Sequence, residues 1–117
     1  MAQPTPEEER ERTLKIRKLN DQLRTTGMGG RIVVTQGIQA LPENTLDRVL
    51  PTISQFSDFT DDNDPYEEHD FGAVTIDGHK IFWKIDYYDE SYQYASPDPT
   101  DPNLTCRVMT IMLAEEY

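Results

Sequence analysis

The dipeptide Asp77-Gly78 separates two runs of strand-forming residues, 71–76 and 79–88. Asp-Gly between such runs favours a two-residue type I′ turn, which fixes the register of a β-hairpin. The register gives three pairs: Ile76 with His79, Val74 with Ile81, and Gly72 with Trp83. The predicted core face carries Val74, Ile76, Ile81, Trp83, Ile85 and Tyr87. Gly72 opposite Trp83 leaves room for the indole on this core face.

The N-terminal part of the chain carries a strong helix signal. Thr5 is a suitable N-cap, Pro6 fits the first helical position, and Glu8 completes a capping-box pattern. Gly27 provides the stop. We therefore expect a helix that ends at about residue 26.

Three further segments have the patterns of regular structure. Residues 32–35 are β-branched and predict a short buried strand. From Thr45, apolar residues recur at helical spacing, but Pro51 falls inside the stretch and predicts two short helical pieces. Residues 106–114 are almost wholly apolar, which favours a strand covered on both sides and leaves a short buried helix as the alternative.

These elements predict an α+β fold. We expect one small domain in which the N-terminal helix and a short broken second helix pack on an antiparallel sheet of three or four strands. The 117 residues, of which 36% are apolar, suffice for one modest core. Residues 1–13 are predicted to be a flexible or helical extension and residues 14–117 the domain, with acidic loops at 57–70 and 90–105.

Charge is distributed unevenly along the chain. Residues 1–50 contain eight bases and seven acids, whereas residues 51–117 contain three bases and fifteen acids. The net charge of −11 argues against nonspecific binding to nucleic acid or to anionic membranes. We therefore expect neither as a partner.

The cysteine content and the length of the apolar runs restrict the cellular compartment and the kinds of site that we expect. The single cysteine, Cys106, excludes an intramolecular disulfide and Cys-rich zinc patterns. No apolar run is long enough to cross a membrane, and the N-terminal residues lack the apolar core of a signal peptide. We expect a cytoplasmic protein with no cofactor.

Several segments together resemble an uncharacterised family of short acidic bacterial proteins, a domain of unknown function. They are LNDQLRTTGMGGRIVVTQGIQAL at 19–41, DNDPYEEHDFG at 62–72, FWKIDYYD at 82–89, SPDPTDP at 96–102 and RVMTIMLAEEY at 107–117. Members of that family are often encoded on plasmids, phages and other mobile elements, so the resemblance implies an accessory role. It implies no catalytic residue. Relatives usually have glycine after the Pro-Tyr of the acidic loop, where this chain has Glu67.

One group of residues suggests acid–base chemistry. A histidine beside carboxylates, with a lysine close by, has the composition of a site that acts on a phosphodiester. The hairpin register pairs Phe71 with Lys84 and predicts that His69 lies near Asp86. The candidate catalytic residues are His69, Lys84, Glu68 and Asp86. The competing interpretation is an ordinary charge-paired hairpin end, in which Lys84 neutralises Asp70 or Asp86.

The acidic loop also contains oxygen ligands of the kind that Ca²⁺ and Mg²⁺ prefer. Their spacing fails the EF-hand pattern, because a loop opened at Asp61 places Gly72 at the position of the bidentate glutamate. The weak candidate ligands are Asp62, Asp64, Glu68 and Asp70. A solvated loop that turns through its Asx side chains explains the same residues, and we expect no bound metal.

Two classes of function remain. The first is a noncatalytic binding protein that presents a nucleic-acid-like anionic surface to a basic protein partner, such as a nucleic-acid-binding host defence protein. The predicted partner-binding residues are Asp61, Asp62, Asp64, Glu67, Glu68, Asp70, Asp86, Asp89 and Glu90. The alternative is a small metal- or His-dependent hydrolase. Because no complete catalytic set is present, the sequence favours the binding protein, a mobile-element accessory or anti-defence inhibitor of undetermined oligomeric state.

Overall fold

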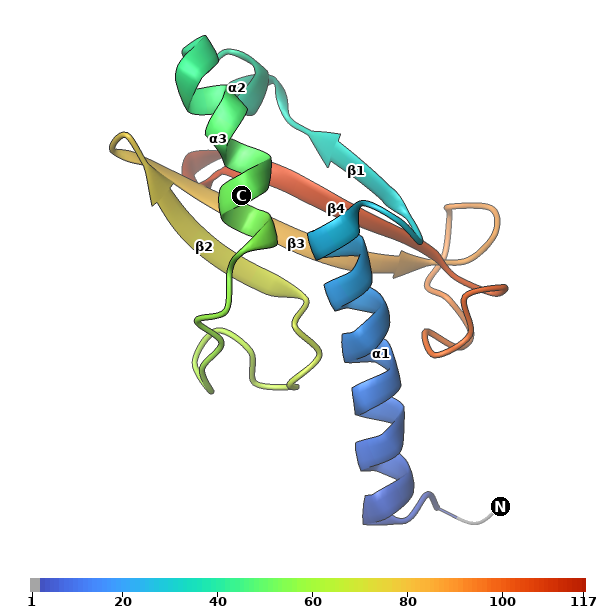
Figure 1. Ribbon diagram of the computed structural model, residues 1–117. Coiled ribbons are helices and arrows are strands. Elements are labelled where there is room, and N and C mark those ends of the chain that lie inside the picture. Colours follow the sequence, from blue (N-terminus) through green and yellow to red (C-terminus); the bar gives the residue numbers. More distant parts are fainter. Residues whose placement is uncertain (1–2) are drawn as a thin grey trace.

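The computed structural model describes residues 3–117 and consists of a four-stranded sheet with helices on one face (Figure 1). The elements in chain order are α1 (Pro6–Thr26), β1 (Arg31–Val34), α2 (Gln36–Gln39), α3 (Glu43–Ser54), β2 (Phe71–Ile76), β3 (His79–Tyr88), β4 (Cys106–Leu113) and the 3₁₀ turn η1 (Ala114–Glu116). The α+β fold class is thereby confirmed. Within these residues, no helix has both the length and the apolar character that a membrane span requires.

The β2–β3 hairpin has the predicted register, with Gly72 opposite Trp83 and Phe71 opposite Lys84. Asp77 and Gly78 both adopt positive φ angles, 51° and 82°, as the central residues of a type I′ turn must. Thr45 of α3 donates a hydrogen bond to the Asp77 carboxylate, at 2.7 Å. The turn is therefore fixed to the helical layer.

The sheet is mixed, whereas the sequence predicted an antiparallel one. Its strand order is β1-β4-β3-β2, and β1 pairs with β4 in parallel. The chain leaves β1 through α2 and α3, reaches the opposite edge at β2, and returns so that β4 fills the position between β1 and β3. The C-terminal apolar segment is thus a strand, and the helical alternative is excluded.

Residue alternation gives the sheet two unlike faces. The core face carries Ile81, Trp83, Ile85, Met109 and Ile111, all buried beneath the helices. On the other face, which Figure 1 shows without a helical cover, Phe82 packs with Phe71 and Tyr117. The described chain is therefore a two-layer structure.

The helices begin and end largely as the sequence signals indicate. The Thr5 side chain accepts a hydrogen bond from the Glu8 backbone N–H at 3.1 Å, and Gly27 ends α1 with a φ of 76°. Part of the predicted extension, residues 1 and 2, lies outside the described residues, and α1 already begins at Pro6.

The prediction of a broken second helix is wrong, because α3 runs continuously through Pro51. Pro51 lies in the last turn of the helix and is exposed. Val49 and Ile53, on either side of it, are 1% and 0% exposed. Their burial stabilises the helical path against the loss of one backbone hydrogen bond.

Candidate functional site

Two acidic loops lie toward the same end of the sheet. Residues 57–70 lead into β2, and residues 89–105 connect β3 to β4. Because β2, β3 and β4 are antiparallel neighbours, the start of β2, the end of β3 and the start of β4 lie at the same end (Figure 1). The first loop contains seven acids, the second contains four, and neither contains Lys or Arg. We call these two loops the acidic end.

Only some of the predicted partner-binding acids are free at the surface of the acidic end. Asp61, Asp62 and Glu90 are exposed. Glu67 is exposed too, but it forms an ion pair with Arg10 at 3.1 Å, and its backbone oxygen accepts a hydrogen bond from Arg17 at 2.7 Å. Helix α1 therefore neutralises part of the charge of the loop.

Other predicted acids are engaged within the fold. Asp64 is 4% exposed. The Glu68 carboxylate accepts a hydrogen bond from the Tyr87 hydroxyl at 2.7 Å, and Asp86 pairs with Lys84 at 3.1 Å. The Ser91 hydroxyl donates to Asp89 at 2.7 Å and, with the backbone amides that follow it, holds the Asp89 pKa below its usual value. These four carboxylates hold local structure in place.

Asp70 is half-buried, and no basic side chain pairs with it in residues 3–117. Burial is the main reason that the pKa of Asp70 rises to about 6, and the negative charge of Glu68 is the second. Asp64 and Asp86 raise the pKa further, whereas a hydrogen bond from the backbone amide of Asp70 lowers it. Asp70 is therefore a carboxyl group whose charge no basic side chain of the described residues offsets.

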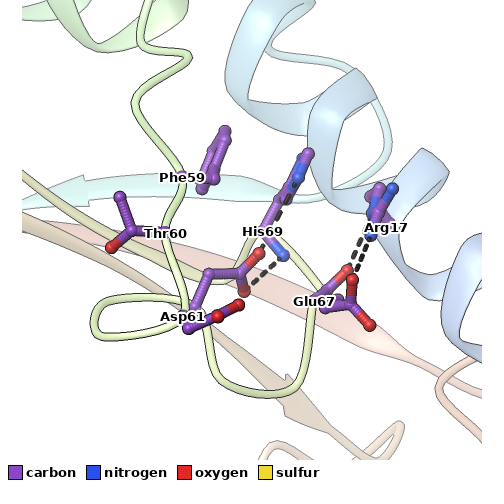
Figure 2. A pocket seen from close by; sticks show the side chains of 7 residues that line it. Arg17, Phe59, Thr60, Asp61, Glu67 and His69 are labelled. Carbon is purple, nitrogen blue, oxygen red and sulfur yellow. Dashed lines mark hydrogen bonds and ion pairs between the residues drawn. The ribbon is translucent and has the colours of Figure 1, made fainter.

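His69 lies at the wall of a small hollow of about 130 Å³ (Figure 2). Its Nδ1 is 2.9 Å from Oδ1 of Asp21 on α1, and its Nε2 is 3.7 Å from Oδ2 of Asp64. The imidazole stacks on the Phe59 ring with centroids 3.7 Å apart. Arg17, held by Glu67, closes one side of the hollow. His69 is thus fixed by two carboxylates and an aromatic ring.

The four candidate catalytic residues do not form one site. His69 and Glu68 contact α1 and the core-facing Tyr87, whereas Lys84 and Asp86 alternate with core residues and project from the other face of β3. The expected proximity of His69 to Asp86 is therefore wrong; the nearby carboxylates are Asp21 and Asp64. The Lys84–Asp86 ion pair is the charge-paired hairpin end that the register also allowed.

The weak metal candidates are likewise dispersed. Within residues 3–117, no group of three or more His, Cys, Asp or Glu side chains has an arrangement that could hold a metal ion. Asp62 is exposed, Asp64 accepts a hydrogen bond from the His69 backbone N–H at 3.0 Å, and Glu68 binds Tyr87.

Comparison with known proteins addresses the family. Residues 34–116 match the family model described as a protein of unknown function, DUF3768. The chain belongs to the DUF3768 family. Searches of curated proteins and of solved structures found no match. The match extends from the end of β1 through the acidic end to η1, and it confirms the resemblance to a domain of unknown function.

Helix α1 precedes the DUF3768 match but is joined to it by a buried polar network. Asn20, which is 0% exposed, donates hydrogen bonds to the Tyr87 hydroxyl at 2.7 Å and to the Glu68 backbone oxygen at 3.0 Å. Its Oδ1 accepts from Arg107 Nε at 2.9 Å. Burial and the bond to Glu68 raise the pKa of Tyr87, so its hydroxyl stays protonated and donates. The network connects α1, both central strands and the first acidic loop.

A second buried base, Arg24, joins α1 to α3 of the DUF3768 domain. Its Nη1 donates to the backbone oxygens of Ile53 and Phe56, at 3.2 and 2.9 Å, and its Nη2 to Asp21 at 3.0 Å. The guanidinium thus adds hydrogen bonds to carbonyls at and just after the end of α3. Our sequence analysis did not single out Asn20, Asp21 or Arg24; the available signal was their position beside Ile16 and Leu23 on the buried side of α1.

Proposed function

We propose that this DUF3768 protein is a noncatalytic binding protein whose acidic end contacts a basic protein partner. The observation that carries the proposal is the position of two loops toward the same end of the sheet, which contain eleven acids in total and no Lys or Arg. Their exposed members, such as Asp61 and Asp62, are free to face a partner. A concentrated negative potential accelerates encounter with a basic groove and selects against acidic partners.

The finer form of the proposal concerns the kind of partner. A basic groove that normally holds nucleic acid matches an anionic surface of this density. We therefore propose that the protein is a mobile-element accessory or anti-defence inhibitor that acts in the cytoplasm on a nucleic-acid-binding defence protein. This part rests on the family resemblance and on charge alone.

The test uses two variants with the same change in charge. The first is Asp58→Asn, Asp61→Asn and Asp62→Asn, which leaves the internal carboxylates of Asp64 and Glu68 intact. The matched control is Glu43→Gln, Asp47→Asn and Glu115→Gln, on exposed positions of α3 and η1.

A partner captured from a cell lysate with the full chain, and identified by mass spectrometry, is then measured by surface kinetics. At about 0.05 M salt we expect the acidic-end variant to associate about tenfold more slowly than the control, and the difference to shrink at about 0.3 M. Equal association rates for the two variants at low salt contradict the proposal.

The hydrolase alternative has one favourable observation. Asp21 orients His69 through Nδ1 at the wall of a hollow that Arg17 also lines, an arrangement that a general base on a phosphodiester would need. The carboxylates of Asp61, Asp64 and Glu67 line the same hollow and would repel that substrate. We rank it second. Phosphodiesterase activity that falls about a hundredfold in His69→Ala would support it, and turnover at the buffer level with and without Mg²⁺ or Mn²⁺ would reject it.

A further inference from the structure

A second hollow, of about 320 Å³, opens beside the start of β2. A cavity of about 10–15 Å³ is enough for one water molecule. The hollow is much larger and admits a side chain. Its lining combines aromatic rings with charged groups: Tyr66, Phe71, Tyr117, Asp70, Lys84 and Asp86. We call it the aromatic hollow. It is separate from the hollow at His69, with which it shares no lining residue.

The aromatic rings at this hollow are unusually open to solvent. Tyr66 is 75% exposed and Tyr117 is 77% exposed. The Tyr117 ring is roughly perpendicular to the rings of Phe71 and Phe82, with centroids 6.3 and 5.8 Å away. Much of the surface of both tyrosines is therefore available to a ligand. Aromatic faces attract cations, and most strongly those with a planar, weakly hydrated charge.

The charged groups of the hollow are unbalanced. Lys84 is paired with Asp86 at 3.1 Å, which leaves Asp70 without a basic partner in the part of the chain that the structure describes. Burial and the adjacent carboxylates raise the pKa of Asp70 to about 6, because both disfavour the charged form of the carboxyl group. A positive group placed here would relieve both the burial cost and the repulsion.

We propose that the aromatic hollow binds an arginine side chain of the basic partner, with the guanidinium against Tyr66 and Tyr117 and its N–H groups donating to Asp70. Arginine fits better than lysine because its planar fork stacks on rings while it donates two parallel hydrogen bonds to one carboxylate. This inference rests on the proposed function, since it names the group of the partner that the acidic end receives. The proposed site would bind one particular side chain of the partner, whereas the rest of the acidic end would attract the partner only by its charge.

The probe is N-acetyl-L-arginine amide, titrated into the full chain with ¹³C-labelled tyrosine rings. Tyr66→Phe and Tyr117→Phe assign the two ring signals. We expect both signals to shift saturably, with a Kd of about 1–10 mM, as befits one isolated side chain. N-acetyl-L-lysine amide should bind several times more weakly. Equal binding of the lysine probe overturns the preference for a guanidinium, and no saturable shift up to about 50 mM overturns the site.

Two variants and a control locate the binding. Asp70→Asn should weaken binding of the arginine probe about tenfold, the order expected for one charge-assisted pair. Tyr66→Ala, at a position too exposed to affect the fold, should also weaken it. Asp47→Asn removes an exposed charge on α3 outside the hollow and should leave the Kd unchanged. Equal effects of Asp47→Asn and Asp70→Asn would mean that the probe responds only to the net charge, and would reject the site.

The probe experiment separates this inference from the proposed function. If the arginine probe fails to bind while the Asp58, Asp61 and Asp62 variant still loses the partner, the aromatic hollow is rejected and the acidic-end proposal stands. If the probe binds but the partner is insensitive to those acids, the acidic-end proposal is rejected instead.

Discussion

Gly72 lies directly opposite Trp83 in the β2–β3 pair, and a Cβ atom at position 72 would stand 2.5 Å from the indole Nε1. The indole itself has little freedom. Trp83 is 0% exposed, and its ring meets Phe56 and Phe59 edge-on at 5.6 and 6.1 Å. The guanidinium carbon of Arg24 lies 5.5 Å from the same ring. The missing side chain at position 72 is therefore a packing requirement of the core.

Replacement of Gly72 by alanine tests that requirement. Gly72→Ala should lower the free energy of unfolding by about 1–3 kcal/mol, because the added methyl group must displace a fully packed indole. Thr75→Ala, at an exposed position of the same strand, should change it by no more than about 0.5 kcal/mol. Urea denaturation gives both values, and equal midpoints for the two variants contradict the close approach.

The two faces of β3 give a second comparison. Trp83→Ala should cost about 3–5 kcal/mol, the range for removal of a large core side chain. Lys80→Ala, on the exposed side, should cost no more than about 0.5 kcal/mol. Denaturant midpoints measured for the two variants provide the check, and similar losses would mean that the hairpin register is wrong.

The hairpin was predictable because its determinants are local. Asp77 and Gly78 set the turn, and the period of two on either side sets the faces. The continuity of α3 was not predictable in the same way, because burial of Val49 and Ile53 against the sheet outweighs the local effect of Pro51. The parallel pairing of β1 with β4 likewise depends on contacts between segments far apart in the chain.

In the candidate site, too, features set by the local sequence were predictable and features set by long-range contacts were not. The sequence indicated that acids gather after residue 50, and antiparallel pairing then places both acidic loops at one end. It did not indicate that His69 would meet Asp21, 48 positions earlier, since no local pattern connects a helix to a loop at that distance. Nor could it separate exposed Asp61 from buried Asp64, because only the folded loop decides which carboxylate turns inward.

Asp70 makes stability depend on pH. Its pKa rises from 3.8 to about 6 on folding, so between those values the folded protein binds a proton that the unfolded chain releases. The free energy of unfolding therefore increases, through this group, as pH falls from 7 toward 4. Two pKa units correspond to about 3 kcal/mol, which we reduce to about 1 kcal/mol because the carboxyl group is partly solvated.

The variant Asp70→Asn isolates this effect from the other carboxylates. At pH 7 it should be about 1 kcal/mol more stable than the unsubstituted protein, and by pH 4 the difference should vanish. Urea midpoints at pH 7, 5 and 4 provide the measurement. Asp62→Asn serves as the control for loss of one charge from the same loop. A stability difference that is the same at all three pH values would exclude Asp70 as its source.

Glu67 has a backbone conformation that suits glycine. Its φ is 60°, in the left-handed region that costs an L-residue about 1–2 kcal/mol. Relatives are expected from the family resemblance to have glycine at this position, and the positive φ supplies a physical reason. The glutamate contributes its exposed ion pair with Arg10, which is worth at most about 1 kcal/mol.

Two substitutions separate backbone conformation from charge at position 67. Glu67→Ala and Glu67→Gly both remove the carboxylate, but only glycine adopts the left-handed region without a steric penalty. We expect Glu67→Gly to be about 1 kcal/mol more stable than Glu67→Ala, after the greater freedom of glycine in the unfolded chain is subtracted. Thermal or urea denaturation of the two variants gives the difference directly. An alanine variant as stable as the glycine variant would show that the loop relaxes out of the left-handed conformation.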